Sequence, residues 1–143
     1  HGVALAPTHL VTLLDPGQTP ADLGLDPARR LHLTIRDTHD RQAAHAPTAD
    51  TVARLLAFAA TMPGTGRLLI HCLSGQSRSP AAALGLLAAR LDPVAAVAAL
   101  RRICPDAAPN RLIVSLCDDA LGLSGQLTEA VAALPAPHWQ NRQ

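Results

Sequence analysis

The segment from His71 to Ser79 combines residue types that could bind a phosphate group and attack it. It reads H-C-L-S-G-Q-S-R-S. Cys72 offers a thiolate nucleophile, and Arg78 carries a planar guanidinium group that can donate to two phosphate oxygens at once. Ser79 can donate its hydroxyl proton to the thiolate, and Gly75 permits backbone angles that a Cβ would exclude. These residues predict nucleophilic chemistry on a tetrahedral anion.

The position of this segment in the chain favours the same chemistry. The apolar run Leu68-Leu69-Ile70 before it is typical of a short strand, and Ser79-Pro80 is typical of the first residues of a helix. A loop in that place can turn its backbone N–H groups toward an anion, and the positive end of the helix dipole faces the same point. The expected phosphate-binding residues are Leu73, Ser74, Gly75, Gln76, Ser77 and Arg78. The same field is expected to lower the pKa of Cys72, and His71 is expected to support the loop from behind.

The rest of the sequence predicts the elements that hold this loop. Apolar, partly β-branched runs bounded by turn residues predict strands over 9–14, 31–35 and 67–71. Further helices are indicated by capping residues and one last periodic stretch, namely Thr48, Asp92-Pro93, Asn110 and residues 126–134. Strands that alternate with helices, followed by helices alone, are typical of an α/β fold. We therefore expect residues 1–143 to form a single three-layer domain with a small, mostly parallel sheet flanked by helices.

Composition and charge exclude several classes of partner. Hydrophobic residues make up 48% of the 143 residues and charged residues 16%, so the chain can bury a core and is not a disordered tail. A net charge of +1 and 1% aromatic residues argue against a surface that binds nucleic acid. The longest apolar stretch, residues 81–89, is far shorter than the roughly 20 residues that a membrane span needs. The 3 Cys residues do not suit a secreted disulfide framework, so we expect a cytoplasmic protein without nucleic-acid or membrane partners.

The segment around Cys72 resembles the phosphate-binding signature of cysteine-dependent protein tyrosine phosphatases, His-Cys-x-x-Gly-x-x-Arg-Ser/Thr. Every defined position is matched, by His71, Cys72, Gly75, Arg78 and Ser79. The order of predicted elements is similar to that of the compact dual-specificity branch, whose later Arg…Pro-Asn segment is matched by Arg102 and Pro109-Asn110. The resemblance covers roughly residues 10–121, looks closest to small bacterial tyrosine phosphatases, and implies that Asn110 braces the loop besides capping a helix. The low-molecular-weight phosphatases and arsenate reductases share the Cys–Arg spacing but place this loop near the N-terminus, which disfavours both.

The resemblance implies hydrolysis of a phosphomonoester in two steps, without a metal or another cofactor. Cys72 attacks the phosphorus atom, a cysteinyl-phosphate forms, and water then releases inorganic phosphate. An acid must protonate the leaving oxygen. Asp37 is the first carboxylate after the strand over 31–35, at the sheet edge where Cys72 is expected. Asp40 is the second candidate for this acid, since Arg36-Asp37-Thr38 lacks the Trp-Pro-Asp motif of the larger phosphatases.

Other interpretations of these residues stay open at this point. A pseudophosphatase would keep the Arg78 cradle and bind phosphorylated partners without hydrolysing them. A sulfur- or arsenate-handling enzyme would need a second reactive thiol from Cys104 or Cys117, which we expect instead in the core. A metal site is disfavoured, because the residues that would form it lack the spacing of zinc ligands. Those residues are His32, His39 and His45 with Asp37.

The substrate is not specified by the sequence. The expected partner is a phosphorylated protein or a small phosphomonoester, which leaves phosphotyrosine, phosphoserine or phosphothreonine, a phosphoinositide and a metabolite as candidates. Gln76 and Ser77 carry no positive charge, which disfavours polyphosphorylated inositides. The oligomeric state is equally open. Family members usually have a strand and a helix before the region where this sequence begins, so we expect one edge of the sheet to be missing or bare.

Overall fold

The sheet at the centre of the structure has three parallel strands. The computed structural model describes residues 6–134. Its strands are β1 (His9–Leu14), β2 (Arg30–Thr34) and β3 (Leu68–His71), in the order β2-β1-β3. All three lie where the sequence predicted them, to within one residue at each end. Leu13 lies beside Leu33, and Val11 lies beside Ile70, so apolar side chains of neighbouring strands meet on one face.

Five α helices lie within the described residues. They are α1 (Ala49–Ala60), α2 (Arg78–Ala88), α3 (Pro93–Ile103), α4 (Arg111–Leu121) and α5 (Gln126–Ala132). The predicted capping residues Thr48, Asp92 and Asn110 each accept a hydrogen bond from a backbone N–H in the first turn of their helix. The α/β fold class is therefore confirmed. Between residues 6 and 134, no helix has the length and apolar character needed to span a bilayer.

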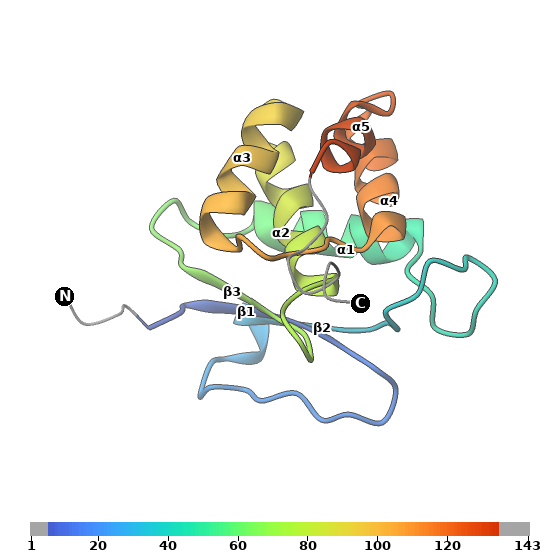
Figure 1. The fold of residues 1–143 in the computed structure, drawn as a ribbon. Coiled ribbons are helices and arrows are strands. Elements are labelled where there is room, and N and C mark those ends of the chain that lie inside the picture. Colours follow the sequence, from blue (N-terminus) through green and yellow to red (C-terminus); the bar gives the residue numbers. More distant parts are fainter. Residues whose placement is uncertain (1–5, 135–143) are drawn as a thin grey trace.

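The α helices and the connection between β1 and β2 lie on opposite faces of the sheet (Figure 1). The connection, residues 15–29, includes the short 3-10 helix η1 (Pro27–Arg29). Because β2 and β3 flank β1 on its two sides, right-handed crossovers from β1 to β2 and from β2 to β3 must run over opposite faces. The layer on the far face is therefore this connection, while all the α helices gather on the face that carries Leu13 and Leu33.

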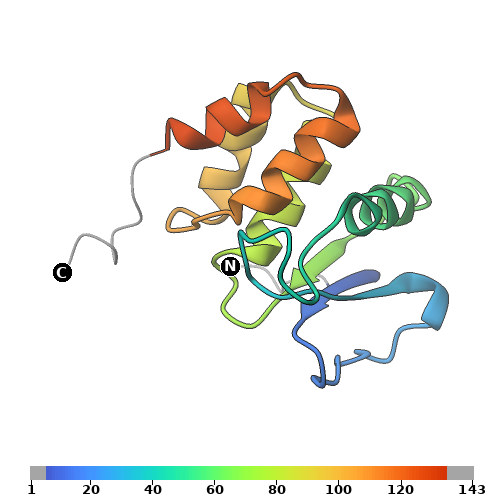
Figure 2. The same ribbon diagram turned by 90° about the vertical axis from the view of Figure 1, so that its right-hand side faces the viewer.

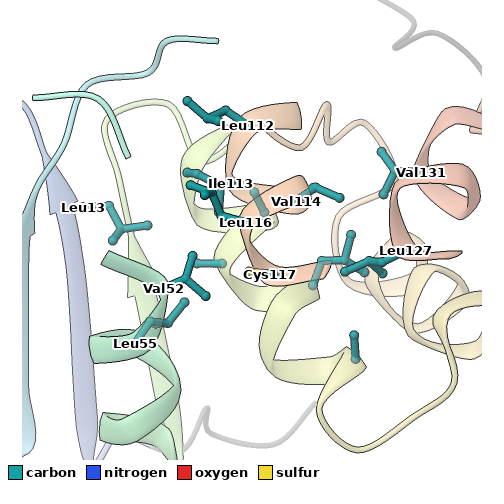
Figure 3. Close-up of a cluster of buried hydrophobic side chains, with 14 of the residues drawn as sticks. Leu13, Val52, Leu55, Leu112, Ile113, Val114, Leu116, Cys117, Leu127 and Val131 are labelled. Carbon is teal, nitrogen blue, oxygen red and sulfur yellow. The ribbon is translucent and has the colours of Figure 1, made fainter. Parts of the chain in front are cut away.

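A core of aliphatic side chains joins the sheet to the helices (Figure 3). Leu13 lies with Val52 and Leu55 of α1 in this core. Helix α4 packs closely on α2 at Gly85, which has no side chain. A Cβ at this position would collide with the Sγ atom of Cys117. Burial raises the pKa of Cys117 to about 12, so this thiol is neutral, in agreement with its expected place in the core. The packing fixes α2, and with it the start of that helix, against the sheet.

Candidate active site

Cys72 follows the last residue of β3 and begins the Cys loop, residues 72–78, which leads into α2. Its side chain is buried, its Sγ lies 3.2 Å from the Ser79 Oγ, and the Ser79 backbone N–H donates to Sγ over 3.4 Å. Burial raises the pKa of Cys72. The hydrogen bonds from Ser79 and from the Gly75 N–H, together with the charge of Arg78, outweigh burial and leave that pKa below its ordinary value. At neutral pH, a larger fraction of Cys72 than of an ordinary cysteine is therefore ionised to the thiolate.

Arg78 is the first residue of α2, and its side chain is buried against the ends of two strands. Its Nη1 donates to the Oδ1 of Asp15 over 2.8 Å and to the backbone oxygen of Ile35 over 2.7 Å. Both hydrogen bonds use Nη1. Within the described residues, Nε and Nη2 donate to no side-chain or backbone acceptor. Those two nitrogens form the edge of the guanidinium group that can donate to two phosphate oxygens.

Asp15 is a site residue that the sequence motifs did not indicate. It follows β1 within the turn Asp15-Pro16-Gly17 and forms a 2.8 Å ion pair with Arg78. The available signal was its position as the first carboxylate after a buried strand, the same signal that pointed to Asp37. Asp15 holds the guanidinium in place and neutralises part of its buried charge.

The backbone of the Cys loop is held from outside by the connection between α3 and α4, residues 104–110. The Ala108 N–H donates to the Gln76 carbonyl over 2.8 Å, and the Asn110 N–H donates to the Ser77 carbonyl over 3.0 Å. In a planar trans peptide group the N–H points away from the carbonyl, so the N–H groups of Ser77 and Arg78 point away from this connection. The loop and the connection lie side by side in Figure 2. Their contact therefore turns two N–H groups inward, as a phosphate cradle requires.

The remainder of the Cys loop is exposed. Gly75 has a φ of 71°, in the left-handed region that favours glycine. Ser74 accepts a hydrogen bond on its Oγ from the Gln76 N–H over 3.3 Å, so a bound anion would compete with this hydroxyl for that N–H. Leu73 directly follows Cys72 and is 58% exposed, which puts an apolar side chain at the rim of the loop.

Asp37 is the acid candidate that the structure brings to the Cys loop. Its Oδ1 accepts a hydrogen bond from the Ser77 Oγ over 2.7 Å and one from the Asn110 Nδ2 over 2.8 Å. Asp40 instead accepts the Gln42 N–H over 2.9 Å, an Asx turn within its own loop. Of the two candidates, only Asp37 touches a residue of the Cys loop.

Asn110 connects Asp37, the Cys loop and α4, and it is almost fully buried. Its Oδ1 accepts the Ile113 N–H over 2.9 Å, which is the predicted helix cap. Its Nδ2 donates to Asp37 and, over 3.1 Å, to the backbone oxygen of Thr38. One side chain thus caps a helix and holds the segment that carries Asp37.

The other residues singled out in the sequence are not drawn into the site. His71 is exposed at the end of β3 and, among residues 6–134, its side chain has no hydrogen-bond partner, so its supporting role stays a prediction. Cys104 is half-buried, and all three cysteines are free thiols. Within residues 6–134, no three side chains of His, Cys, Asp or Glu lie together as metal ligands would.

Neither a family model nor a curated protein matches this chain. The loop motif and the side-chain contacts around the Cys loop therefore have to indicate what this site can do.

Proposed function

We propose that this chain is a phosphomonoester hydrolase of the cysteine-dependent protein tyrosine phosphatase type, with tyrosine or dual-specificity activity. The observation that carries the proposal is the meeting of Cys72, Arg78 and Asp37 around one loop, although Asp37 comes from a separate part of the chain. Cys72 supplies a nucleophile, Arg78 an anion clamp and Asp37 an acid. These are the groups that phosphoryl transfer through a covalent intermediate requires.

The first step transfers the phosphoryl group to Cys72. The Sγ atom attacks phosphorus in line with the leaving oxygen, so the S–P bond forms as the P–O bond breaks. Asp37 gives its proton to the leaving oxygen, which departs as a neutral hydroxyl group. Arg78 and the inward N–H groups of the Cys loop bind the three remaining phosphoryl oxygens and stabilise the charge that they carry.

The second step regenerates the enzyme. Asp37, now ionised, accepts a proton from a water molecule whose oxygen attacks phosphorus. The S–P bond breaks, inorganic phosphate leaves, and Cys72 returns as a thiolate. The Ser79 hydroxyl, 3.2 Å from Sγ, donates to that thiolate and so makes it a better leaving group.

The substrate of the proposed reaction is a phosphorylated protein or a small phosphomonoester, and no metal or other cofactor takes part. The proposed setting is the cytoplasm. The mechanism needs Cys72 in its reduced form, and a reducing compartment preserves free thiols such as Cys72, Cys104 and Cys117.

The test is hydrolysis of para-nitrophenyl phosphate in the presence of EDTA across the acidic to neutral pH range. The wild type should turn over, Cys72→Ser should lose at least about 10⁴-fold in kcat, and Cys104→Ser should match the wild type. Acid-quenched wild type should carry a phosphate adduct on Cys72 in the mass spectrum. Activity retained by Cys72→Ser would exclude the covalent mechanism. A wild type that binds orthovanadate without turning over substrate would instead be a pseudophosphatase.

A further inference from the structure

The two hydrogen bonds that hold the Asp37 carboxyl group end at the same oxygen. Ser77 and Asn110 both donate to Oδ1, and within residues 6–134 no group donates to Oδ2. Two donors occupy the acceptor positions of Oδ1, so the acidic proton belongs on Oδ2. We infer that Asn110 is a positioning residue that selects Oδ2 as the proton-carrying oxygen of the general acid, an inference that rests on the proposed function.

The orientation of the Asn110 amide is determined by its surroundings. Its oxygen must face the Ile113 N–H, which it accepts over 2.9 Å, so its nitrogen must face Asp37. The second proton of Nδ2 points to the Thr38 carbonyl, and the Asn110 backbone N–H points to Ser77. The buried side chain thus has all its polar atoms engaged and cannot turn without losing several hydrogen bonds at once.

Asn110, and not Ser77, makes the selection. A hydroxyl group both donates and accepts, so Ser77 could accept a proton from Oδ1 by rotating its own O–H bond. The amide nitrogen of Asn110 can only donate. A proton on Oδ1 would therefore point at the N–H of Asn110, which cannot accept a hydrogen bond from it. Protonation of Oδ1 therefore costs the Asn110 hydrogen bond, whereas protonation of Oδ2 leaves both hydrogen bonds intact.

This selection matters because Asp37 is an exposed residue on a loop. Without Asn110, the carboxyl group would sample several rotamers and would carry its proton on either oxygen. Because Asn110 already holds the carboxyl group in one orientation, no further conformational entropy is lost when the proton is transferred to the leaving oxygen. The benefit applies in the first step, where Oδ2 gives its proton to the leaving oxygen, and in the second, where Oδ2 takes one from water.

The test uses two substitutions that preserve the helix cap. Asn110→Ser keeps an N-cap oxygen for the Ile113 N–H but is too short to donate to Asp37, and Asn110→Asp keeps the shape but cannot donate. The measurement is kcat/KM for a series of aryl phosphates with good to poor leaving groups. Both variants should lose at least about tenfold with poor leaving groups and little with good ones. Asp92→Asn, the converse exchange at the cap of α3, should match the wild type.

The pH profile and a double-mutant cycle separate positioning from a structural role. In Asn110→Asp the basic limb of the profile should move to higher pH, since a second carboxylate beside Asp37 favours its protonated form. In an Asp37→Asn background, Asn110→Ser should cause no further loss with poor leaving groups. An equal loss with all leaving groups, or a full loss in that background, would make Asn110 a structural brace and overturn the inference alone. A wild type that hydrolyses no aryl phosphate would overturn the proposed function and this inference with it.

Discussion

The proposed nucleophile and the proposed acid of the candidate site are held in different ways. Cys72, Arg78 and Ser79 are at most 8% exposed and lie where β3 leads into α2, against the core. Asp37 is exposed, and hydrogen bonds from Ser77 and Asn110 hold it. A fully buried aliphatic side chain contributes about 1.5–3 kcal/mol, and a hydrogen bond contributes a net 0.5–1.5 kcal/mol, about half as much. The residues around Cys72 are therefore held more strongly than the loop that carries Asp37.

This difference separates two kinds of mutational effect. Substitutions on the nucleophile side alter the charge or the packing of buried side chains around Cys72. They should therefore lower activity on every substrate. Changes on the acid side remove a contact at an exposed loop, so they should leave the fold intact. Their effect should then depend on how much help the leaving group needs.

Among the substitutions that leave the nucleophile itself in place, Arg78→Lys should have the largest effect, and it tests the nucleophile side. Lysine keeps the charge but lacks the planar fork, and it cannot reach Asp15, the Ile35 carbonyl and a phosphate group together. We expect kcat/KM to fall by about 10²–10³-fold for good and poor leaving groups alike. Steady-state kinetics on both substrate types measure this, with the exposed Arg90→Lys as control. A loss confined to poor leaving groups would assign Arg78 to acid catalysis instead.

Asp37→Asn tests the acid side and should lower kcat by about 10–100-fold with poor leaving groups, but little with activated ones. The basic limb of the pH profile should disappear, because no group remains there to lose its proton. Asp40→Asn is the matched control, since the Asp40 carboxylate accepts a hydrogen bond from the Gln42 N–H within its own turn. If Asp40→Asn lost the basic limb and Asp37→Asn kept it, the acid would be Asp40.

Local sequence patterns predicted the strand and the helix on either side of the Cys loop well for a physical reason. Strand, Cys loop and helix are contiguous, so the motif around Cys72 also specifies the elements that position it. The ion pair of Arg78 with Asp15 and the contact of Asn110 with Asp37 join residues 63 and 73 positions apart. Such pairings depend on how β1, β2 and α4 meet in space, and periodicity within one segment carries no record of that. Asp15 was missed for this reason, and the contact between Asn110 and Asp37 was not foreseen.

Ser79→Ala tests the field around the thiolate and should have a moderate effect. The Ser79 hydroxyl is among the groups that hold the pKa of Cys72 below its ordinary value, so its removal should raise that pKa. Alkylation by iodoacetamide as a function of pH reports the thiolate. Its midpoint should lie below that of a free cysteine in the wild type and move to higher pH in Ser79→Ala. Cys117, with a pKa of about 12, should stay unreactive in both. Identical midpoints would mean that the hydroxyl does not stabilise the thiolate.

Gly75→Ala should have the smallest effect. It tests whether the exposed part of the Cys loop helps to lower the pKa of Cys72. No atom lies within 4 Å of a Cβ built on Gly75, so the cost is only that of holding alanine at a φ of 71°, about 1–2 kcal/mol. The loop is exposed here and should relax to a negative φ at lower cost. That relaxation turns the Gly75 N–H away from Sγ, and the pKa of Cys72 should rise by less than in Ser79→Ala. Urea unfolding should then reveal a loss below about 1 kcal/mol. Gly64→Ala, in equally open space and without a positive φ, is the control, and equal behaviour of the two variants would show that the Gly75 backbone has no part in holding the thiolate.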